Sequence, residues 1–299
     1  MKITLFYQNV TVLDYAYLDD HLGVVGNSLK VHVEFIGETD EEGVLYDFSY
    51  AKKKVKEIID RDCDHRLVIP SGVAKREGER VEFDYTYGLY DEKLTYDCPE
   101  EGVCEIPSKH VSYENLKTYL EEIILKDMPK NVVSISLKLE EENLGENKPI
   151  YHYTHGLKDH YGNCQRLYHG HRNSVDIKVN GKERRDLEEK LSREVLNSNV
   201  HFALWENVVN KDEVLKLSGD SLPEGRYSEL PVVEIKYTSS QGEFIGSLPG
   251  RAVYFMQDES TVENLSIHFA RWVKSQVSEH DIVQVRAYEG VAKGSITTL

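Results

Sequence analysis

The sequence predicts an α+β protein built from two similar units. Its 299 residues are comfortable for two domains of about 150 residues each. Some segments alternate apolar and polar residues, which is typical of half-buried strands, while others carry apolar residues at helical spacing. One pattern is used twice: Glu114-Asn115-Leu116 and Glu263-Asn264-Leu265 each follow a Ser or Thr and open a helical run. We place the boundary near residue 146, so that the units are residues 1–145 and 146–299.

The first unit reads as hairpin, helix, helix, hairpin. Residues 31–36 alternate as a strand and residues 49–59 place their apolar side chains on one helical face. A second helix runs through residues 117–125, and an alternating strand follows at 131–140. Residues 79–87 add strand-like material between the helices. This order predicts a sheet with both helices on one face.

The second unit repeats that order. Residues 174–179 predict a strand and residues 186–196 a helix. Inserted strand-like residues follow at 231–237, and a helix opens near residue 264. The last alternating strand, residues 281–289, ends on a glutamate, as the equivalent strand of the first unit does. One structural unit is therefore used twice.

Charge and cysteine content exclude several classes of protein. Thirty-six basic residues stand against 52 acidic ones, a net charge of −16, so we expect no nucleic-acid partner and no membrane partner. No window holds the roughly 18 consecutive apolar residues of a membrane span. The apolar run at the start of the sequence, within residues 1–8, is too short for a signal peptide. Four cysteines make no disulfide framework in a chain of this length, which favours the cytoplasm. Cys98 and Cys104 are expected in loops.

Three histidines form the strongest local constellation. His169 and His171 lie two apart on a predicted strand, so their side chains share one face. His155 closes residues 151–155, a plausible hairpin partner of that strand. Three imidazoles on one sheet face suit a zinc ion, and three protein ligands leave a fourth position open, as in catalytic sites. The alternative is a group of surface histidines in a His-rich turn.

Four other residues are candidates for chemistry. Cys164 could act as a thiolate base beside a metal, or it could be a small buried apolar residue. Asp64 could orient His65 as a proton relay, although such pairs also end helices at the surface. Glu289 could accept two hydrogen bonds from a guanidine-like heterocycle edge, or it could be a solvated carboxylate.

Together these pieces resemble the 6-pyruvoyl-tetrahydropterin synthase / 6-carboxytetrahydropterin synthase family. The resemblance rests on five motifs in order: Cys164 followed by His169-Gly170-His171, Gly43-Val-Leu-Tyr-Asp47-Phe48, Asp64-His65, Thr261-Val-Glu263-Asn264, and residues 283–289. It covers both halves. It implies two tandem tunnelling-fold units, each an antiparallel four-stranded sheet with two helices on one face, plus inserted strands.

Each half keeps what the other has lost. Counting back from residue 31, the family's His-Gly-His falls on Val25-Gly26-Asn27, and its first zinc histidine falls on about Tyr17. The first unit therefore lacks metal ligands. In the second unit, Val200-His201 stands where Asp-His is expected.

The resemblance then implies a composite site. Zn²⁺ is held by His155, His169 and His171, and the second unit also supplies the catalytic Cys164. Asp64 and His65 come from the first unit of the same or another chain. The residues that bind substrate are Glu289, Thr261 and Glu263.

The implied substrate is 7,8-dihydroneopterin triphosphate. Cleavage to acetaldehyde and triphosphate would give 6-carboxy-5,6,7,8-tetrahydropterin, a precursor of 7-deazaguanine bases and queuosine. Elimination alone would give 6-pyruvoyl-tetrahydropterin, and a third alternative is a non-catalytic pterin- or zinc-binding scaffold. Since open sheet edges need covering, a homo-oligomer is expected, either a trimer or a dimer.

Overall fold

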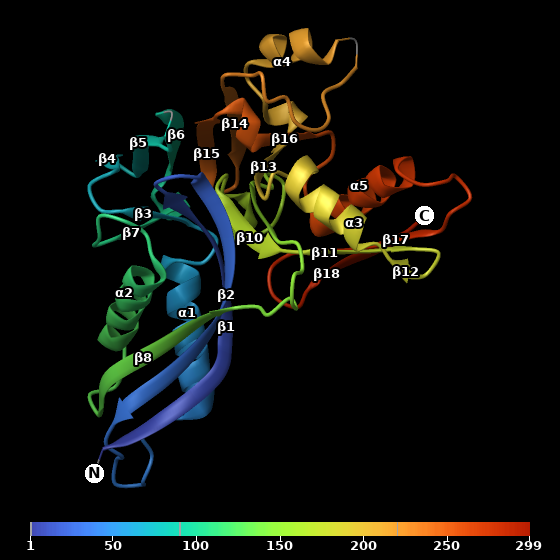
Figure 1. Ribbon diagram of the computed structural model, residues 1–299. Coiled ribbons are helices and arrows are strands. Elements are labelled where there is room, and N and C mark those ends of the chain that lie inside the picture. Colours follow the sequence, from blue (N-terminus) through green and yellow to red (C-terminus); the bar gives the residue numbers. More distant parts are fainter. Residues whose placement is uncertain (1, 90, 220) are drawn as a thin grey trace.

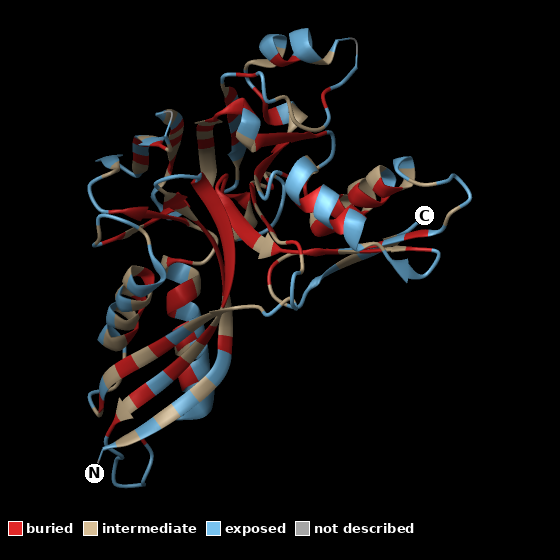
Figure 2. Cartoon of the chain, in the orientation of Figure 1, coloured by how far each residue is buried: buried red, intermediate tan, exposed pale blue. Residues whose placement is uncertain are grey.

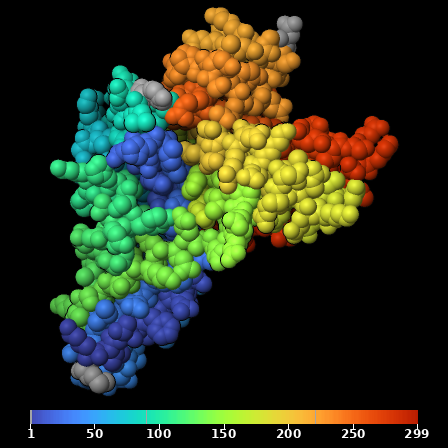
Figure 3. Space-filling view, in the orientation of Figure 1, coloured from blue at the N-terminus to red at the C-terminus, as the bar shows by residue number. Residues whose placement is uncertain are grey.

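The predicted α+β class is confirmed by the computed structural model, which describes residues 2–89, 91–219 and 221–299. Helices and sheets pack as layers, and the first and second units occupy different ends of the molecule (Figure 1). In the space-filling view, the blue and green surface of the first unit is continuous with the yellow and orange surface of the second (Figure 3). The site described below lies where the two units meet.

The first unit has one five-stranded sheet in the order β7-β3-β1-β2-β8. Its long hairpin, β1 and β2, pairs Leu13 with Leu29 and Tyr17 with Val25. The strands are β1 (Ile3–Asp19), β2 (Gly23–Gly37), β3 (Leu67–Pro70), β7 (Val103–Ile106) and β8 (Val132–Glu141). Helices α1 (Phe48–Asp62) and α2 (Tyr113–Lys126) bury their apolar stripes in one core with this sheet.

Side-chain caps begin α1, α2 and α5, and the last two fall on the repeated motif where the sequence predicts them. The Asp47 carboxylate accepts from the Ser49 amide at 2.8 Å at the start of α1. Ser112 caps α2 and Thr261 caps α5 (Val262–Ser275), each accepting from the backbone amide of the Asn in the repeated motif. Each cap satisfies an amide that the first turn leaves without a partner, which is worth about 1 kcal/mol. The repeated helix signal is confirmed in both units.

The second unit divides its strands between two four-stranded sheets, β10-β9-β13-β16 and β12-β11-β17-β18. Their bounds are β9 (Tyr151–His155), β10 (His169–Asn173), β11 (Val175–Val179), β12 (Lys182–Glu183), β13 (Asn199–Leu204), β16 (Val253–Met256), β17 (Val283–Tyr288) and β18 (Gly294–Thr298). Helix α3 (Arg185–Glu189) continues as a π-helical turn over Lys190–Val195. This helix and α5 pack on β11 and β17 through a core of their own.

The inserted strands of the two halves form one shared sheet, in the order β14-β15-β6-β5-β4. Strand β15 of the second half pairs with β6 of the first, with Gly246 opposite Tyr96. The strands are β4 (Lys75–Glu77), β5 (Arg80–Tyr87), β6 (Glu92–Pro99), β14 (Val233–Ser239) and β15 (Gly242–Leu248). A third core, with Leu18, Tyr168 and Phe244 among its members, lies under this sheet.

Three details differ from the sequence expectation. The main sheets are not purely antiparallel, because β3 runs parallel to β1 and to β7, and β13 runs parallel to β9 and to β16. Cys98 and Cys104 are not in loops: they lie buried on β6 and β7, because the strands there carry apolar residues into the cores. An additional helix, α4 (Lys211–Ser218), stands in the second insertion.

Short 3₁₀ turns connect several strands. They span Glu100–Gly102, Asn163–Gln165, Trp205–Asn207 and Gly250–Ala252. No helix among residues 2–89, 91–219 and 221–299 has the length and apolar character required to cross a membrane.

Candidate metal centre and active site

Three buried histidines converge at the junction of the units. Strands β9 and β10 pair with His155 directly opposite His169, and His171 follows two residues along the same face. One ring nitrogen from each lies within 4.8 Å of the other two. The rings of His155 and His169 are 4.4 Å apart between centroids, and His171 stands at 5.5 and 5.7 Å from them. The hairpin expected from the sequence therefore does gather these side chains.

Hydrogen bonds fix which nitrogen faces inward in two of the rings, and a carboxylate faces Nδ1 of the third. His155 Nδ1 donates to the Ser260 carbonyl at 3.1 Å, and His169 Nδ1 donates to the Arg166 carbonyl at 2.9 Å. His171 Nδ1 lies 3.2 Å from a carboxylate oxygen of Asp14. Since each Nδ1 faces an acceptor, each Nε2 keeps a lone pair, and all three Nε2 atoms are buried without a hydrogen-bond partner among the described residues.

This donor set fits a divalent metal. Burial, and after it the neighbouring imidazoles, lower the pKa of His155 and of His169 well below the usual value, so both rings are neutral. Buried nitrogens without partners are costly unless a ligand satisfies them. Neutral imidazoles oriented through Nδ1 by a carbonyl or a carboxylate are the usual ligands of zinc.

Asp14 is a site residue that sequence reasoning missed. It comes from β1 of the first unit, yet its carboxylate faces His171 of the second, and it also accepts from Ser28 Oγ at 2.5 Å and from Lys293 Nζ at 3.2 Å. Burial opposes its ionisation, but His171, Lys293 and Ser28 outweigh burial and lower the pKa of the Asp14 carboxyl. Asp14 lies 157 positions before His171 in the sequence, so no local pattern indicates that the two side chains meet.

Asp64, His65 and Cys164 stand beside the triad in the same chain. Asp64 Oδ2 lies 2.5 Å from His65 Nδ1, and the His65 ring stacks on His169 with centroids 5.1 Å apart. Burial opposes protonation of His65, but its hydrogen bonds with Asp64 and Cys164 outweigh burial and raise the pKa of His65 to about 10. Cys164, on the 3₁₀ turn Asn163–Gln165, is partly exposed.

Arg166 holds the loops that carry these groups. Its buried guanidinium donates to the backbone carbonyls of Asp64 at 3.2 Å and His65 at 3.5 Å. It also donates to Gln241, in the turn between β14 and β15 of the shared inserted sheet. His65 has a left-handed backbone, with φ at 55°, and its amide donates to the Asp14 carbonyl at 2.7 Å. A non-glycine residue in that region persists only where its surroundings fix it.

The remaining predicted residues lie around this cluster. Glu289 follows β17, and its neighbour Gly290 donates through its amide to Asn173 of the hairpin that carries the three histidines. Thr261 uses its side chain to cap α5, and Glu263 is exposed on that helix, so the structure does not bring either into the histidine cluster. Ser260, one residue before Thr261, is the one that touches His155.

Strand register explains why the first unit lacks the cluster. Tyr17 pairs with Val25 in β1 and β2 as His155 pairs with His169 in β9 and β10. By the same register Asn27 corresponds to His171. The expectation that Val200-His201 takes the place of Asp-His is wrong, since His201 pairs with Thr154 as Leu67 pairs with Ala16. By this register Asp64 and His65 correspond to Ser198 and Asn199 instead.

The sequence also matches known proteins in both halves. The sequence model described as 6-pyruvoyl tetrahydropterin synthase matches residues 14–145 and again residues 147–298. The chain belongs to this family. The tandem arrangement and the resemblance seen in the motifs are thereby confirmed, and so is the enzyme class, because family members are tetrahydropterin synthases, which are lyases.

Two named relatives and one solved structure are each similar to part of this chain. The chain is 28% identical over 117 residues to a Pyrococcus horikoshii protein provisionally named 6-carboxy-5,6,7,8-tetrahydropterin synthase, which covers 39% of this chain and 68% of the relative. A Pyrococcus abyssi protein with the same name is 26% identical over the same shares. Among solved structures, the 6-pyruvoyl tetrahydropterin synthase of Plasmodium vivax matches 48% of this chain and 94% of its own, with 19% identity and a TM-score of 0.39.

Proposed function

We propose that this pterin synthase is a zinc-dependent 6-carboxy-5,6,7,8-tetrahydropterin synthase that acts on 7,8-dihydroneopterin triphosphate. The observation that carries the proposal is the cluster itself: three metal-ready imidazoles with a thiol and an Asp-oriented imidazole beside them in one chain. A non-catalytic scaffold does not need the Cys164 thiol together with the Asp64–His65 pair. The names of the two Pyrococcus relatives support the carboxylated product.

The proposed metal ligands are His155, His169 and His171. A bound zinc ion supplies Lewis acidity toward the hydroxyl oxygens of the substrate side chain, which makes the adjacent C–H acidic. The ligands sit at 0–1% exposure, so the chemistry is kept away from bulk water on that side. Access for the substrate is proposed from the side of Cys164, which is the partly exposed member of the cluster.

The chain's own residues then move protons and orient the ring. Cys164 as a thiolate takes the proton from the substrate carbon, and protonated His65 is poised to return one, with Asp64 holding its Nδ1. Glu289 binds the amino-pyrimidine edge of the pterin through two parallel hydrogen bonds. Positioning of this kind contributes several kcal/mol to lowering a barrier. Thr261 and Glu263 lie at the start of α5 and remain proposed contacts for a part of the substrate that extends toward that helix.

Turnover with product analysis tests the proposal. The zinc-loaded chain is incubated with 7,8-dihydroneopterin triphosphate, and pterins and acetaldehyde are separated and quantified. We expect the 6-carboxy product with one equivalent of acetaldehyde, and its loss in Cys164→Ala. Cys98→Ser, a change at a buried thiol on β6, is the matched control and should keep turnover. A 6-pyruvoyl product without acetaldehyde would favour elimination alone, and no product with metal bound would favour a scaffold.

A homo-oligomer in the cytoplasm is proposed with this activity. Strands β8 and β18 end their sheets, and each exposes an apolar residue, Val133 at 49% and Ile296 at 53%. Edge strands of this kind are open to pairing with another copy. Light scattering should return a trimer or a dimer; a monomer at micromolar concentration would contradict this part of the proposal.

A further inference from the structure

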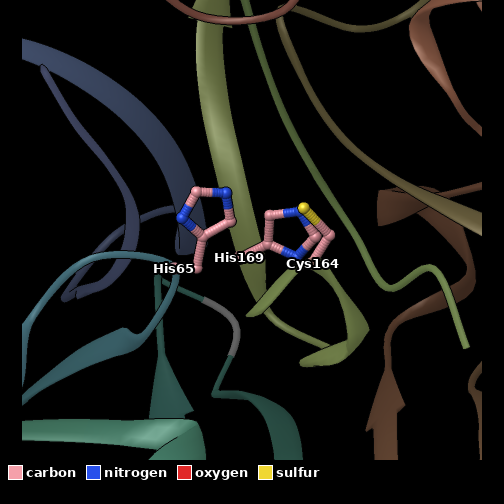
Figure 4. A group of neighbouring side chains, drawn as sticks. All are labelled: His65, Cys164 and His169. Atoms are coloured by element: carbon pink, nitrogen blue, oxygen red, sulfur yellow. The ribbon is translucent and has the colours of Figure 1, made fainter. Parts of the chain in front are cut away.

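A second group of metal-binding atoms lies against the histidine triad. Cys164, His65 and His169 each place one ligand atom within 4.8 Å of the other two (Figure 4). His65 comes from the first unit, in the loop before β3, while Cys164 and His169 come from the second. The triad is buried throughout, whereas this group has two partly exposed members. An ion from solvent therefore reaches this group first.

The free atoms in this group are suitable donors. Asp64 occupies Nδ1 of His65, so Nε2 is the nitrogen left to face Cys164 and His169. A carboxylate behind an imidazole fixes its orientation and strengthens it as a ligand. A thiolate with two imidazoles is a soft donor set, which favours thiophilic cations such as Zn²⁺ and Cd²⁺ over hard ones.

The two groups share one ligand atom. His169 Nδ1 donates to the Arg166 carbonyl, so only Nε2 is free, and one lone pair binds one ion. A cation held by Cys164, His65 and His169 therefore leaves the triad with two of its three ligands. Occupancy of one full ligand set excludes occupancy of the other.

We propose that Cys164, His65 and His169 form a second, inhibitory site for a thiophilic divalent cation, which competes with the triad for His169. Binding there takes Cys164 as the thiolate and His65 as the neutral imidazole, so the proton that His65 carries on Nε2 is released to solvent. The cation then occupies the two groups assigned to proton transfer. The binding rests on geometry alone, whereas the inhibition rests on the proposed function. Cadmium is expected to inhibit the zinc-loaded chain, because a more thiophilic cation draws His169 away from the triad, while one equivalent of zinc at the triad does not inhibit.

Cobalt is a probe that separates the two sites, because a thiolate ligand adds a charge-transfer absorption that imidazole ligands do not. The metal-free full chain carrying His171→Ala has a broken triad and an intact second group. We expect it to bind one Co²⁺ with the thiolate absorption. Adding Cys164→Ser should abolish that absorption and weaken Co²⁺ binding at least tenfold, while adding Cys98→Ser should leave both unchanged.

The wild-type chain provides a measurement that needs no variant. Titration of the zinc-loaded chain with Cd²⁺ should develop a cadmium–thiolate absorption in step with inhibition. If His171→Ala fails to fold by circular dichroism, His155→Ala breaks the same triad from another strand. Absence of thiolate absorption in the folded triad variant and in cadmium-treated wild type, or its survival after Cys164→Ser, would overturn the proposal. Absorption without any turnover would instead refute only the proposed function.

Discussion

Replacing Asp14 by asparagine tests whether the first unit supports the metal centre of the second. The substitution keeps the shape of the side chain and its ability to accept from Ser28, but it removes the negative charge 3.2 Å from His171 Nδ1. Loss of a partner behind a metal-ligating imidazole usually costs about 10–100-fold in metal affinity. That range corresponds to about 1.4–2.8 kcal/mol of binding free energy.

The asparagine carbonyl still accepts from the His171 N–H, so we expect the lower half of that range for Asp14→Asn and the upper half for Asp14→Ala. Competition with a chromophoric chelator measures the zinc dissociation constant of each full-length variant. The control is Asp176→Asn. Asp176 lies on β11, away from the triad, and its carboxylate pairs with Lys148. An unchanged dissociation constant in both Asp14 variants, with one zinc bound by wild type, would refute the reasoning.

Other substitutions probe charge at the site and in the fold. Burial raises the pKa of Glu259 to about 7, so the folded chain holds this proton more tightly than the unfolded chain does. The free energy of unfolding therefore falls as pH rises from about 4.5 through 7. Measured by urea unfolding, Glu259→Gln should be more stable than wild type by about 1–2 kcal/mol at pH 8 and by almost nothing at pH 4. Lys148→Met leaves the buried Glu188 carboxylate with less compensation and should cost about 2 kcal/mol, whereas Lys53→Met, at an exposed pair, should cost under about 0.5 kcal/mol in the same assay. Glu289→Gln should raise KM for the pterin at least tenfold with zinc affinity unchanged, and an unaltered KM would remove Glu289 from the pterin site.

Local patterns were enough to predict the units and the triad. His169 and His171 two apart on one strand, with His155 on a neighbouring strand, share a face because strand side chains alternate. The helix caps follow from residue type and spacing in the same way. These features depend on contacts within a few residues or within one hairpin, which a sequence pattern records directly.

Long-range pairing could not be predicted in that way. The alternation in the inserted strands predicted strands but not that β6 would pair with β15, about 150 residues later. Tyr168, which lies between Cys164 and His169 in sequence, is buried against this shared sheet, with its ring centroid 4.7 Å from that of Tyr96. The segment that carries the histidine cluster therefore packs on a sheet whose pairing the sequence pattern does not record.

Close backbone packing shows why the two halves depend on each other. A Cβ on Gly26 of the first unit would lie 2.0 Å from the Tyr153 carbonyl and 2.6 Å from the His171 amide of the second. The strands involved are buried where the units meet (Figure 2). Such close approach fixes the distance between the units, and with it the placement of His65 and Asp14 against the triad.

In the first unit, Tyr17, Val25 and Asn27 occupy the strand positions that His155, His169 and His171 occupy in the second. The strand pairing that presents Gly26 to the second unit is the same despite this difference. The histidine cluster of the second unit also includes side chains of the first, because the carboxylate that faces His171 and the imidazole beside Cys164 both come from it. Duplication within one chain allows this asymmetry: two identical subunits would have to change together, whereas two halves can keep different parts of one site.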